Sequence, residues 1–438
     1  MQLLRLLSIF LVLSLMLAHP ARAVTLLRDP DIEHALKQLA KPVLEAAGLS
    51  ASRVDILVID DRKLNAFVID QDSIFINSGL LLKMRTPQML QAILAHEAAH
   101  IANGHLVRRP INFRNARTAA SLGLALAAIA GAATGSAQAA AGIAAGSQGT
   151  AQRLFFAHNR SEESSADSAA IRYMVRSGID PMGAVEVMDL FRGQEALSAS
   201  RRDPYASTHP LSADRVRVMQ RLAEPHKGRF TPSNSDLYWF ARAKGKLSAF
   251  QRNPKWTLAR TGESGFADVK AMREAIAYHR QSDLRNAIAA MDRALAARPN
   301  DAFYHELRGQ ILMESRQFAP ATASYARAVN AAPRNALILG AYGRALLTQG
   351  QSGKALEILE KARARDGRDG RVLRDLAAAH AKSGNPGLAS VVTAERYALI
   401  GRLDDAVIHA NRASGLLPSG SGGWQRAQDV LQAAKRAQ

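Results

Sequence analysis

Two histidines and a glutamate within one helical turn are the residues of this sequence best placed to do chemistry. His96 and His100 lie four positions apart in a largely apolar run that begins at Met89. On a helix this spacing puts both imidazoles on one face, one turn apart, where both can bind a single zinc ion. Glu97 lies beside the first histidine and is placed to take a proton from a zinc-bound water. The motif therefore predicts a catalytic zinc site.

A catalytic zinc site needs a third protein ligand and an open fourth position. A third histidine in the same stretch would require glycine at position 103 and histidine at position 106, but the sequence has Asn103 and Leu106. We therefore expect a carboxylate from a second helix. Glu163 and Asp167 are one helical turn apart, so Glu163 is the expected ligand, and Asp167 is expected to hold a ligand histidine in its tautomer.

The acidic residues and a nearby histidine have alternative interpretations. Glu162 is adjacent to Glu163, and only the expected phase of the helix favours Glu163 as the ligand. Asp167 could instead pair with a surface arginine such as Arg160. His105 follows the motif closely, but we expect it to be a packed or solvated histidine rather than a metal ligand.

The order of several short segments resembles the M48 family of zinc metallopeptidases. Residues 65–67 and 74–80 look like that family's paired strands, and residues 205–211 with Arg215 look like its later His-Pro segment. Together with the motifs at His96–His100 and Glu163–Asp167, they span most of residues 30–225. The resemblance implies an α+β zincin-like metalloprotease domain in this part of the chain.

The resemblance also implies a role for each residue of the site. The implied zinc ligands, for one Zn²⁺ per chain, are His96, His100 and Glu163. Glu97 would be the general base. His209 would approach the metal, either as a reversible fourth ligand that closes the site or as a group that polarises the scissile carbonyl. The alternative for His209 is a turn histidine that merely precedes Pro210.

Residues 1–23 are typical of a secretory signal peptide. Arg5 precedes an apolar run at residues 6–17, and Ala21 and Ala23 provide a small-residue cleavage site. Cleavage there would make Val24 the first residue of the mature chain. A membrane anchor is the alternative, although the run is short for a span. We expect a periplasmic protein, and the absence of cysteine excludes disulfides and a lipid-attachment cysteine.

The formal net charge is +19, which would draw an exported protein towards anionic lipid and allow peripheral membrane contact. Nucleic acid is the other usual partner of basic chains. Export and the lack of a recognition motif argue against it. Arginines solvated on helix faces remain the simplest explanation of the charge.

The elements that must position the site can be predicted from periodicity. Helices are expected at residues 30–50 and 86–106, and strands at residues 54–59 and 67–76. We assign residues 24–225 to the protease domain. Within it, residues 118–152 are uncharged and rich in alanine and glycine. They predict a helical hairpin that is buried against the protease core or lies at the membrane surface.

The second half of the chain repeats with a period of 34 residues. Small residues recur at this spacing in two series, Ala275, Gly309, Gly343 and Ala377, and Ala287, Ala321, Ala355 and Ala389. This pattern resembles tetratricopeptide repeats. We therefore expect a linker with one helix at residues 226–263 and an all-α tetratricopeptide-repeat solenoid at residues 264–438. The register slips near residues 388–400, so a helix there should serve two units or begin a cap.

Together these features predict an exported zinc metalloendopeptidase with a module that binds protein segments. Within the M48 family, the combination resembles periplasmic members that act in outer-membrane barrel assembly. That resemblance implies misfolded or stalled outer-membrane proteins as substrates and the barrel-assembly machinery as a partner. Residues 74–77 could pair with an extended substrate by strand addition. The alternatives are a chaperone or assembly scaffold with a latent zinc site and, for the solenoid, a passive spacer.

Overall fold

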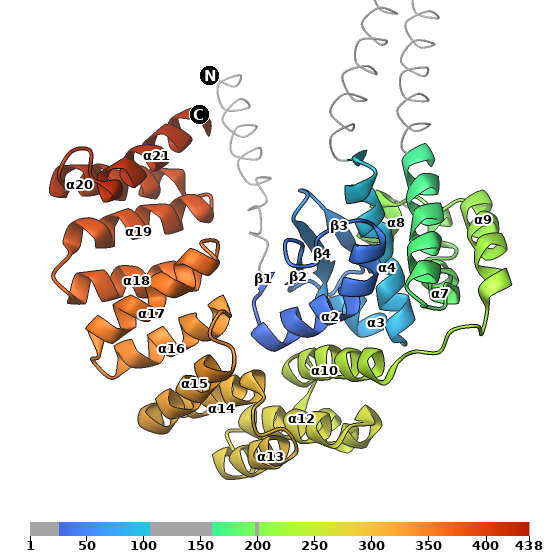
Figure 1. Ribbon diagram of the computed structural model, residues 1–438, viewed down its shortest axis with the longest axis horizontal. Helices are drawn as coiled ribbons and strands as arrows, with labels where there is room; N and C mark the ends of the chain where they lie inside the picture. Colours follow the sequence, from blue (N-terminus) through green and yellow to red (C-terminus); the bar gives the residue numbers. More distant parts are fainter. Residues whose placement is uncertain (1–25, 106–159, 198–200, 438) are drawn as a thin grey trace, which may run out of the picture.

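The computed structural model describes residues 26–105, 160–197 and 201–437. A small sheet with its covering helices forms one body, and an arc of helix pairs forms the other; α10 (Asn234–Gln251) and α12 (Ala267–His279) join them (Figure 1). The predicted signal segment and the uncharged segment at residues 118–152 lie outside the described residues. Within the described ranges, none of the helices has both the length and the apolar character that a membrane span requires.

The described residues form one four-stranded sheet of order β1-β2-β4-β3. Its strands are β1 (Leu26–Leu27), β2 (Asp55–Ile59), β3 (Ala66–Val68) and β4 (Ser73–Asn77). β2 runs parallel to β4, whereas β1 and β3 are antiparallel to their neighbours. The strand expected at residues 54–59 is confirmed. The segment at residues 67–76 is the antiparallel pair of β3 and β4, with Phe67 opposite Phe75.

The position of β4 corrects one prediction. β4 lies between β2 and β3, so both of its edges are already paired. Strand addition by a substrate at residues 74–77 is therefore wrong, because addition requires a free edge. The edge strands of this sheet are β1 and β3.

The helix that carries the histidine motif is α4 (Pro87–Ala102). Its start is encoded by Thr86, whose side chain accepts a hydrogen bond from the Met89 amide, and by proline at the first helical position. The helix ends before the predicted residue 106, because Gly104 adopts a left-handed conformation with φ of 67°. The sequence therefore predicted the start of the helix more accurately than its end.

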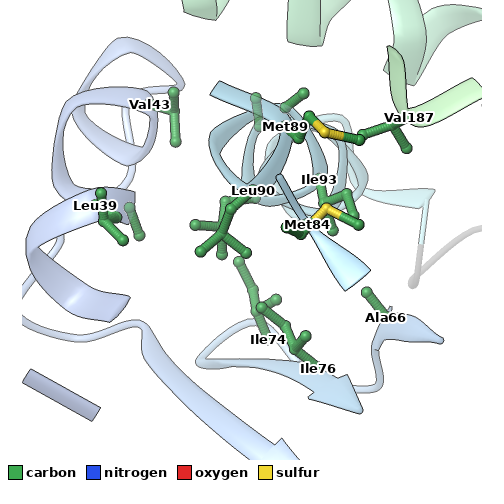
Figure 2. Packing of buried hydrophobic residues seen from close by; sticks show 14 of the residues in the cluster. Leu39, Val43, Ala66, Ile74, Ile76, Met84, Met89, Leu90, Ile93 and Val187 are labelled. Carbon is green, nitrogen blue, oxygen red and sulfur yellow. The ribbon is translucent and has the colours of Figure 1, made fainter. Parts of the chain in front are cut away.

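Apolar side chains hold α4 between the sheet and the helices α2 (Pro30–Ala46) and α7 (Met182–Leu190). Figure 2 shows Leu90 of α4 facing Leu39 on one side and Ile74 on the other. Because nearly all of α4 is buried, packing fixes the direction of its two histidines. The other helices of this body are α3 (Ser78–Lys83), a helix whose described part covers residues 160–176, α8 (Pro204–Thr208) and α9 (Ala213–Ala223), with 3-10 turns at Gln194–Ala196 and Glu224–His226.

The segment predicted as a linker contains α10, and this helix is packed on two sides. Phe240 and Leu247 are buried in the core around α4, whereas Tyr238 and Ala249 are buried in the core of the first helix pair. The short helix α11 (Pro254–Ala259) and the 3-10 turn Thr261–Ser264 follow. The two bodies therefore share a helix rather than an exposed connection.

The rest of the chain forms consecutive helix pairs, which confirms the predicted all-α solenoid. After α12 the helices are α13 (Leu284–Ala297), α14 (Ala302–Glu314), α15 (Phe318–Ala331), α16 (Ala336–Thr348), α17 (Ser352–Arg365), α18 (Gly370–Lys382), α19 (Pro386–Leu399), α20 (Leu403–Leu416) and α21 (Gly422–Ala437). The repeated small residues allow close approach: a Cβ on Gly343 would lie 2.5 Å from the Leu359 side chain. α19 packs against both α18 and α20 and so serves two units, which explains the slip in register.

The solenoid also contacts the first body near its N-terminal strand. Arg28, directly after β1, forms an ion pair with Asp366 in the loop before α18, with 2.7 Å between Nη2 and Oδ2. Arg371 donates a hydrogen bond to the Arg28 carbonyl, and Arg368 pairs with Asp55 of β2. The arc of helices therefore meets the small body at α10 and again at β1.

Candidate metal centre

His96 and His100 project from one face of α4 into the interior. Both side chains are buried, and their Nε2 atoms are 3.1 Å apart. This is the arrangement expected for residues at i and i+4 of a helix. The two imidazoles therefore share one small buried volume.

The carboxylate of Glu163 joins the two histidines. It comes from the helix at residues 160–176 and is buried, with Oε1 3.4 Å from His100 Nε2 and Oε2 3.4 Å from His96 Nε2. The adjacent Glu162 is not part of this group. The phase of the helix thus decides which of the two glutamates faces the histidines.

His209 enters the same group directly after α8. Its Nδ1 atom lies 3.2 Å from His96 Nε2 and 3.0 Å from Glu163 Oε2, and its Nε2 atom lies 3.4 Å from Oε1 of Glu97. One potential ligand atom from each of His96, His100, Glu163 and His209 lies within 4.8 Å of the others. Residues far apart in the sequence therefore converge on one point.

The donor atoms of this group fit a divalent transition metal. Imidazole nitrogens together with a carboxylate oxygen are a set that zinc takes in proteins. Glu163 Oε1 and His209 Nε2 are buried, and neither has a hydrogen-bond partner among the residues that the structure describes. A buried carboxylate oxygen without a partner is costly, and a bound cation would remove that cost.

The electrostatics of the group also favour a positive charge. Burial alone would lower the pKa of His96, but hydrogen bonds with Asp167 and Glu163 outweigh it and raise the pKa to about 10. Burial would raise the pKa of Glu163, yet its contacts with His209 and His96 hold it well below the usual range. Burial, followed by the charge of His96, lowers the pKa of His100. The carboxylates therefore remain ionised and stabilise a cation among the histidines.

A model of the family described as Peptidase family M48 matches residues 27–223, the part of the chain that holds this group. Residues 27–223 are a peptidase family M48 domain. The predicted enzyme class, a metalloendopeptidase, is thereby confirmed, and peptidases of this family bind a metal.

Proteins similar to this chain include the beta-barrel assembly-enhancing protease of Escherichia coli O157:H7. It is 25% identical over 406 residues, which cover 90% of this chain and 81% of the relative. The mitochondrial metalloendopeptidase OMA1 of Schizosaccharomyces pombe is 27% identical over 207 residues, which cover 46% of this chain and 56% of that protein. Among solved structures, MamA MSR-1 C2 is 18% identical and has a TM-score of 0.32 over 38% of this chain and 97% of that chain.

Arg215 connects the groups behind the metal site of the M48 domain. Its guanidinium donates hydrogen bonds of 2.7 and 2.9 Å to Asp167 and one of 2.7 Å to the carbonyl of Pro210. Asp167 in turn lies 3.1 Å from His96 Nδ1. Asp167 thus pairs with a buried arginine from α9. In the sequence, only the family resemblance indicated a role for Arg215. Its contact with Asp167 joins residues 48 positions apart, which local patterns do not predict.

His105 and Tyr205 support the site through contacts that the sequence did not predict. His105 is buried, with its Nδ1 2.9 Å from the Nδ1 of His100, because the left-handed Gly104 turns the chain back. The ring of Tyr205 lies 4.6 Å from that of His209. His105 is not among the residues grouped as potential ligands. His105 contacts His100 and Tyr205 contacts His209, so each helps to orient a histidine of the metal group.

We expect Asp167→Asn to weaken metal binding by the M48 domain about tenfold to a hundredfold. Asparagine lacks the negative charge that holds His96 Nδ1 and Arg215 in place. Competition with a chelator measures the metal affinity. Asp214→Asn makes the same change at an exposed position of α9 and should bind metal as the wild type does. Equal affinities of Asp167→Asn and wild type would show that Asp167 does not support the site.

Proposed function

We propose that this chain is an exported zinc endopeptidase that degrades misfolded or stalled outer-membrane proteins. The convergence of His96, His100 and Glu163 on one buried point supports the proposal. The two histidines come from α4, which also carries Glu97, and Glu163 comes from the helix at residues 160–176. Two imidazoles and a carboxylate leave a fourth position for water or substrate, as catalytic zinc sites require. The proposed stoichiometry is one zinc ion per chain.

The residues of the M48 domain would divide the work of peptide hydrolysis. Zinc held by the three ligands supplies a Lewis acid. Glu97 is the proposed general base, which accepts a proton on its carboxylate as water is activated and passes it to the leaving amine. Its burial keeps bulk water away from that proton. Asp167 orients His96, and Arg215 holds Asp167.

Two observations support the compartment and the substrate class. Residues 1–23 have the pattern of a signal peptide. A relative aligned over 90% of the chain, and so over both bodies, carries the name beta-barrel assembly-enhancing protease. On this basis we propose that the chain acts in the periplasm, contacts the membrane peripherally and associates with the barrel-assembly machinery. The solenoid would then hold unfolded clients near the M48 domain.

A scaffold with a latent metal site is the second candidate, and the position of His209 favours it. A fourth protein ligand would close the position that catalysis needs. Wild type and Glu97→Gln, each loaded with zinc, should be incubated with an unfolded outer-membrane protein. Cleavage by wild type alone supports the peptidase. Equal rescue of assembly by both proteins, without cleavage, supports the scaffold.

His209→Ala separates the two roles considered for His209. If His209 closes the fourth position, the variant should cleave peptides faster than wild type, because water can enter. If His209 stabilises the transition state, activity should fall about tenfold to a thousandfold, as for the loss of one oxyanion donor. Peptide hydrolysis and zinc content are measured together. Unchanged activity in a folded, zinc-loaded variant would contradict both roles.

Ending the chain at Gly262 tests the role proposed for the solenoid. The fragment keeps every residue of the metal group and keeps α10 on the core around α4. We expect it to hydrolyse a short unfolded peptide as the full chain does. We also expect it to lose co-purification with the barrel-assembly machinery, because the solenoid no longer concentrates partners near the site. If the fragment co-purifies as well as the full chain, residues 118–152 become the better docking candidate.

A further inference from the structure

A cavity of about 450 Å³ lies between the M48 domain and the inner side of the solenoid. Leu27 and Ile32 line it from β1 and the start of α2, and Met313, Leu337 and Val372 line it from α14, α16 and α18. In Figure 1, β1 lies within the arc that these helices form. Among the described residues, those that line the cavity include none of the metal group. The cavity is therefore a separate feature of the molecule.

The arginines that line this cavity already have acidic partners. The pairs are Arg28–Asp366, Arg344–Asp375 and Arg371–Asp369, with N–O distances of 2.7, 2.8 and 3.0 Å. An anionic ligand would have to compete with these carboxylates. The cavity is therefore poorly suited to an acidic segment.

The floor of the cavity has an excess of negative charge. Asp29 and Glu306 line the floor and belong to a buried cluster of charged side chains. Within the described ranges, this cluster contains four carboxylates and two cations. The members are Asp29, Asp31, Asp301 and Glu306 with Arg242 and Lys246. Lys246 lies 2.9 Å from Asp29 but 4.0 Å from Glu306. The cation that Asp29 and Glu306 share is therefore closer to Asp29 than to Glu306.

Glu306 is a member of this cluster that lines the cavity and has only a long contact with a cation of the cluster. It is 7% exposed, and its Oε2 atom has no hydrogen-bond partner in the described part of the chain. Burial outweighs the attraction of Lys246 and raises the pKa of Glu306 to about 7. A buried carboxylate in this position costs free energy until a donor or a cation meets it. Because Glu306 lines the cavity, that donor can come from a ligand.

The chain itself shows what kind of segment this face accepts. Leu26, Leu27 and Arg28 lie beside the solenoid as two apolar residues followed by a basic one. The Arg28 carbonyl accepts a hydrogen bond of 3.2 Å from Arg371, and its guanidinium reaches Asp366. β1 is an edge strand and lines the cavity, so a second extended segment can add beside it.

We propose that the cavity binds an extended segment of a client polypeptide and takes one lysine or arginine side chain of that segment against Glu306. The apolar wall accepts the neighbouring side chains, and the incoming cation balances the charge of the cluster. The inference deepens the client-holding role proposed for the solenoid and rests on it. It does not depend on the chemistry of the metal centre.

Two labelled peptides test the proposal: Gly-Leu-Leu-Arg-Gly-Gly and its analogue with glutamine in place of arginine. Their affinities for the full-length Glu97→Gln chain, which should not cut them, are measured by fluorescence anisotropy. We expect the arginine peptide to bind about tenfold to a hundredfold more tightly, as a charged hydrogen bond allows. Adding Glu306→Gln should abolish this preference. Adding Glu357→Gln, the same change at an exposed position of α17, should leave it intact.

The proposal is overturned if the two peptides bind equally, if neither binds below about 1 mM, or if Glu306→Gln keeps the preference. Binding of acetyl-arginine amide as tight as that of the peptide would also overturn it, in favour of a site for small cations. Thermal melting distinguishes a role of Glu306 in binding from a role in stability. Glu306→Gln should not lower the Tm. If the variant loses both binding and Tm, Glu306 contributes to stability instead, and the proposal is overturned. None of these outcomes changes the expectation that the wild-type chain cleaves unfolded protein. If the proposed peptidase function is wrong, that cleavage is absent, so the two failures can be told apart.

Discussion

Glu97→Gln is expected to bind zinc as the wild-type chain does and to hydrolyse peptides about a hundredfold to ten-thousandfold more slowly. Glutamine keeps the shape of the side chain but cannot accept the proton that hydrolysis releases. Glu97 is not one of the residues grouped as potential ligands, so the metal should stay in place. Zinc per chain and the rate of peptide hydrolysis are measured on the same sample.

The ligand variants should behave in the opposite way. His96→Ala, His100→Ala and Glu163→Ala each remove one donor atom, so zinc occupancy should fall and activity should fall with it. Glu162→Ala is a matched control, because it makes the same change at the next position, outside the ligand group. Full zinc in Glu163→Ala would remove Glu163 from the ligand set and make Glu162 the next candidate.

Arg242→Ala is expected to lower the free energy of unfolding by about 3–5 kcal/mol. Arg242 is fully buried and donates hydrogen bonds of 2.6 Å to Asp31 of α2 and of 2.6 and 2.7 Å to Asp301 at the start of α14. Its guanidinium also lies 4.0 Å from the centre of the Tyr304 ring. Alanine would leave two carboxylates in a buried position without this cation, at the contact that joins the two bodies.

Urea unfolding followed by tryptophan fluorescence measures this loss, because the Trp239 ring lies 5.5 Å from the Arg242 guanidinium. Arg402→Ala is the control. Arg402 is exposed and pairs with Asp405, so its removal should change the free energy of unfolding by less than about 1 kcal/mol. A loss for Arg242→Ala no larger than that of the control would mean that the two bodies are held together by other contacts.

Features that depend on a few neighbouring residues could be predicted from the sequence. Thr86 and the proline after it mark the start of α4, and the spacing of His96 and His100 fixes their common face. The period of small residues marks the helix pairs, because only small side chains allow the close approach seen at Gly343. In each of these cases, the geometry of a few neighbouring residues is sufficient to predict the structure.

Contacts between distant segments were not predictable in the same way. Arg215 reaches Asp167 across 48 residues, and no periodicity specifies that pairing. The edges of β4 are occupied because β2 and β3 lie on either side of it, which the alternation of apolar residues does not reveal. The helix predicted within the linker is α10, but its packing depends on both bodies at once, so the sequence did not reveal that both bodies share it.

The ion pair between Arg28 and Asp366 joins residues 338 positions apart, and this separation has a consequence for the order of folding. Contacts that close long loops form slowly, because the chain must lose much of its freedom before they contribute. Synthesis completes the metal group at His209, long before Asp366 exists. The M48 domain can therefore fold while its first strand still lacks this partner. In a refolding chain, hydrogen exchange should show protection in α4 before protection of the amides around Arg28.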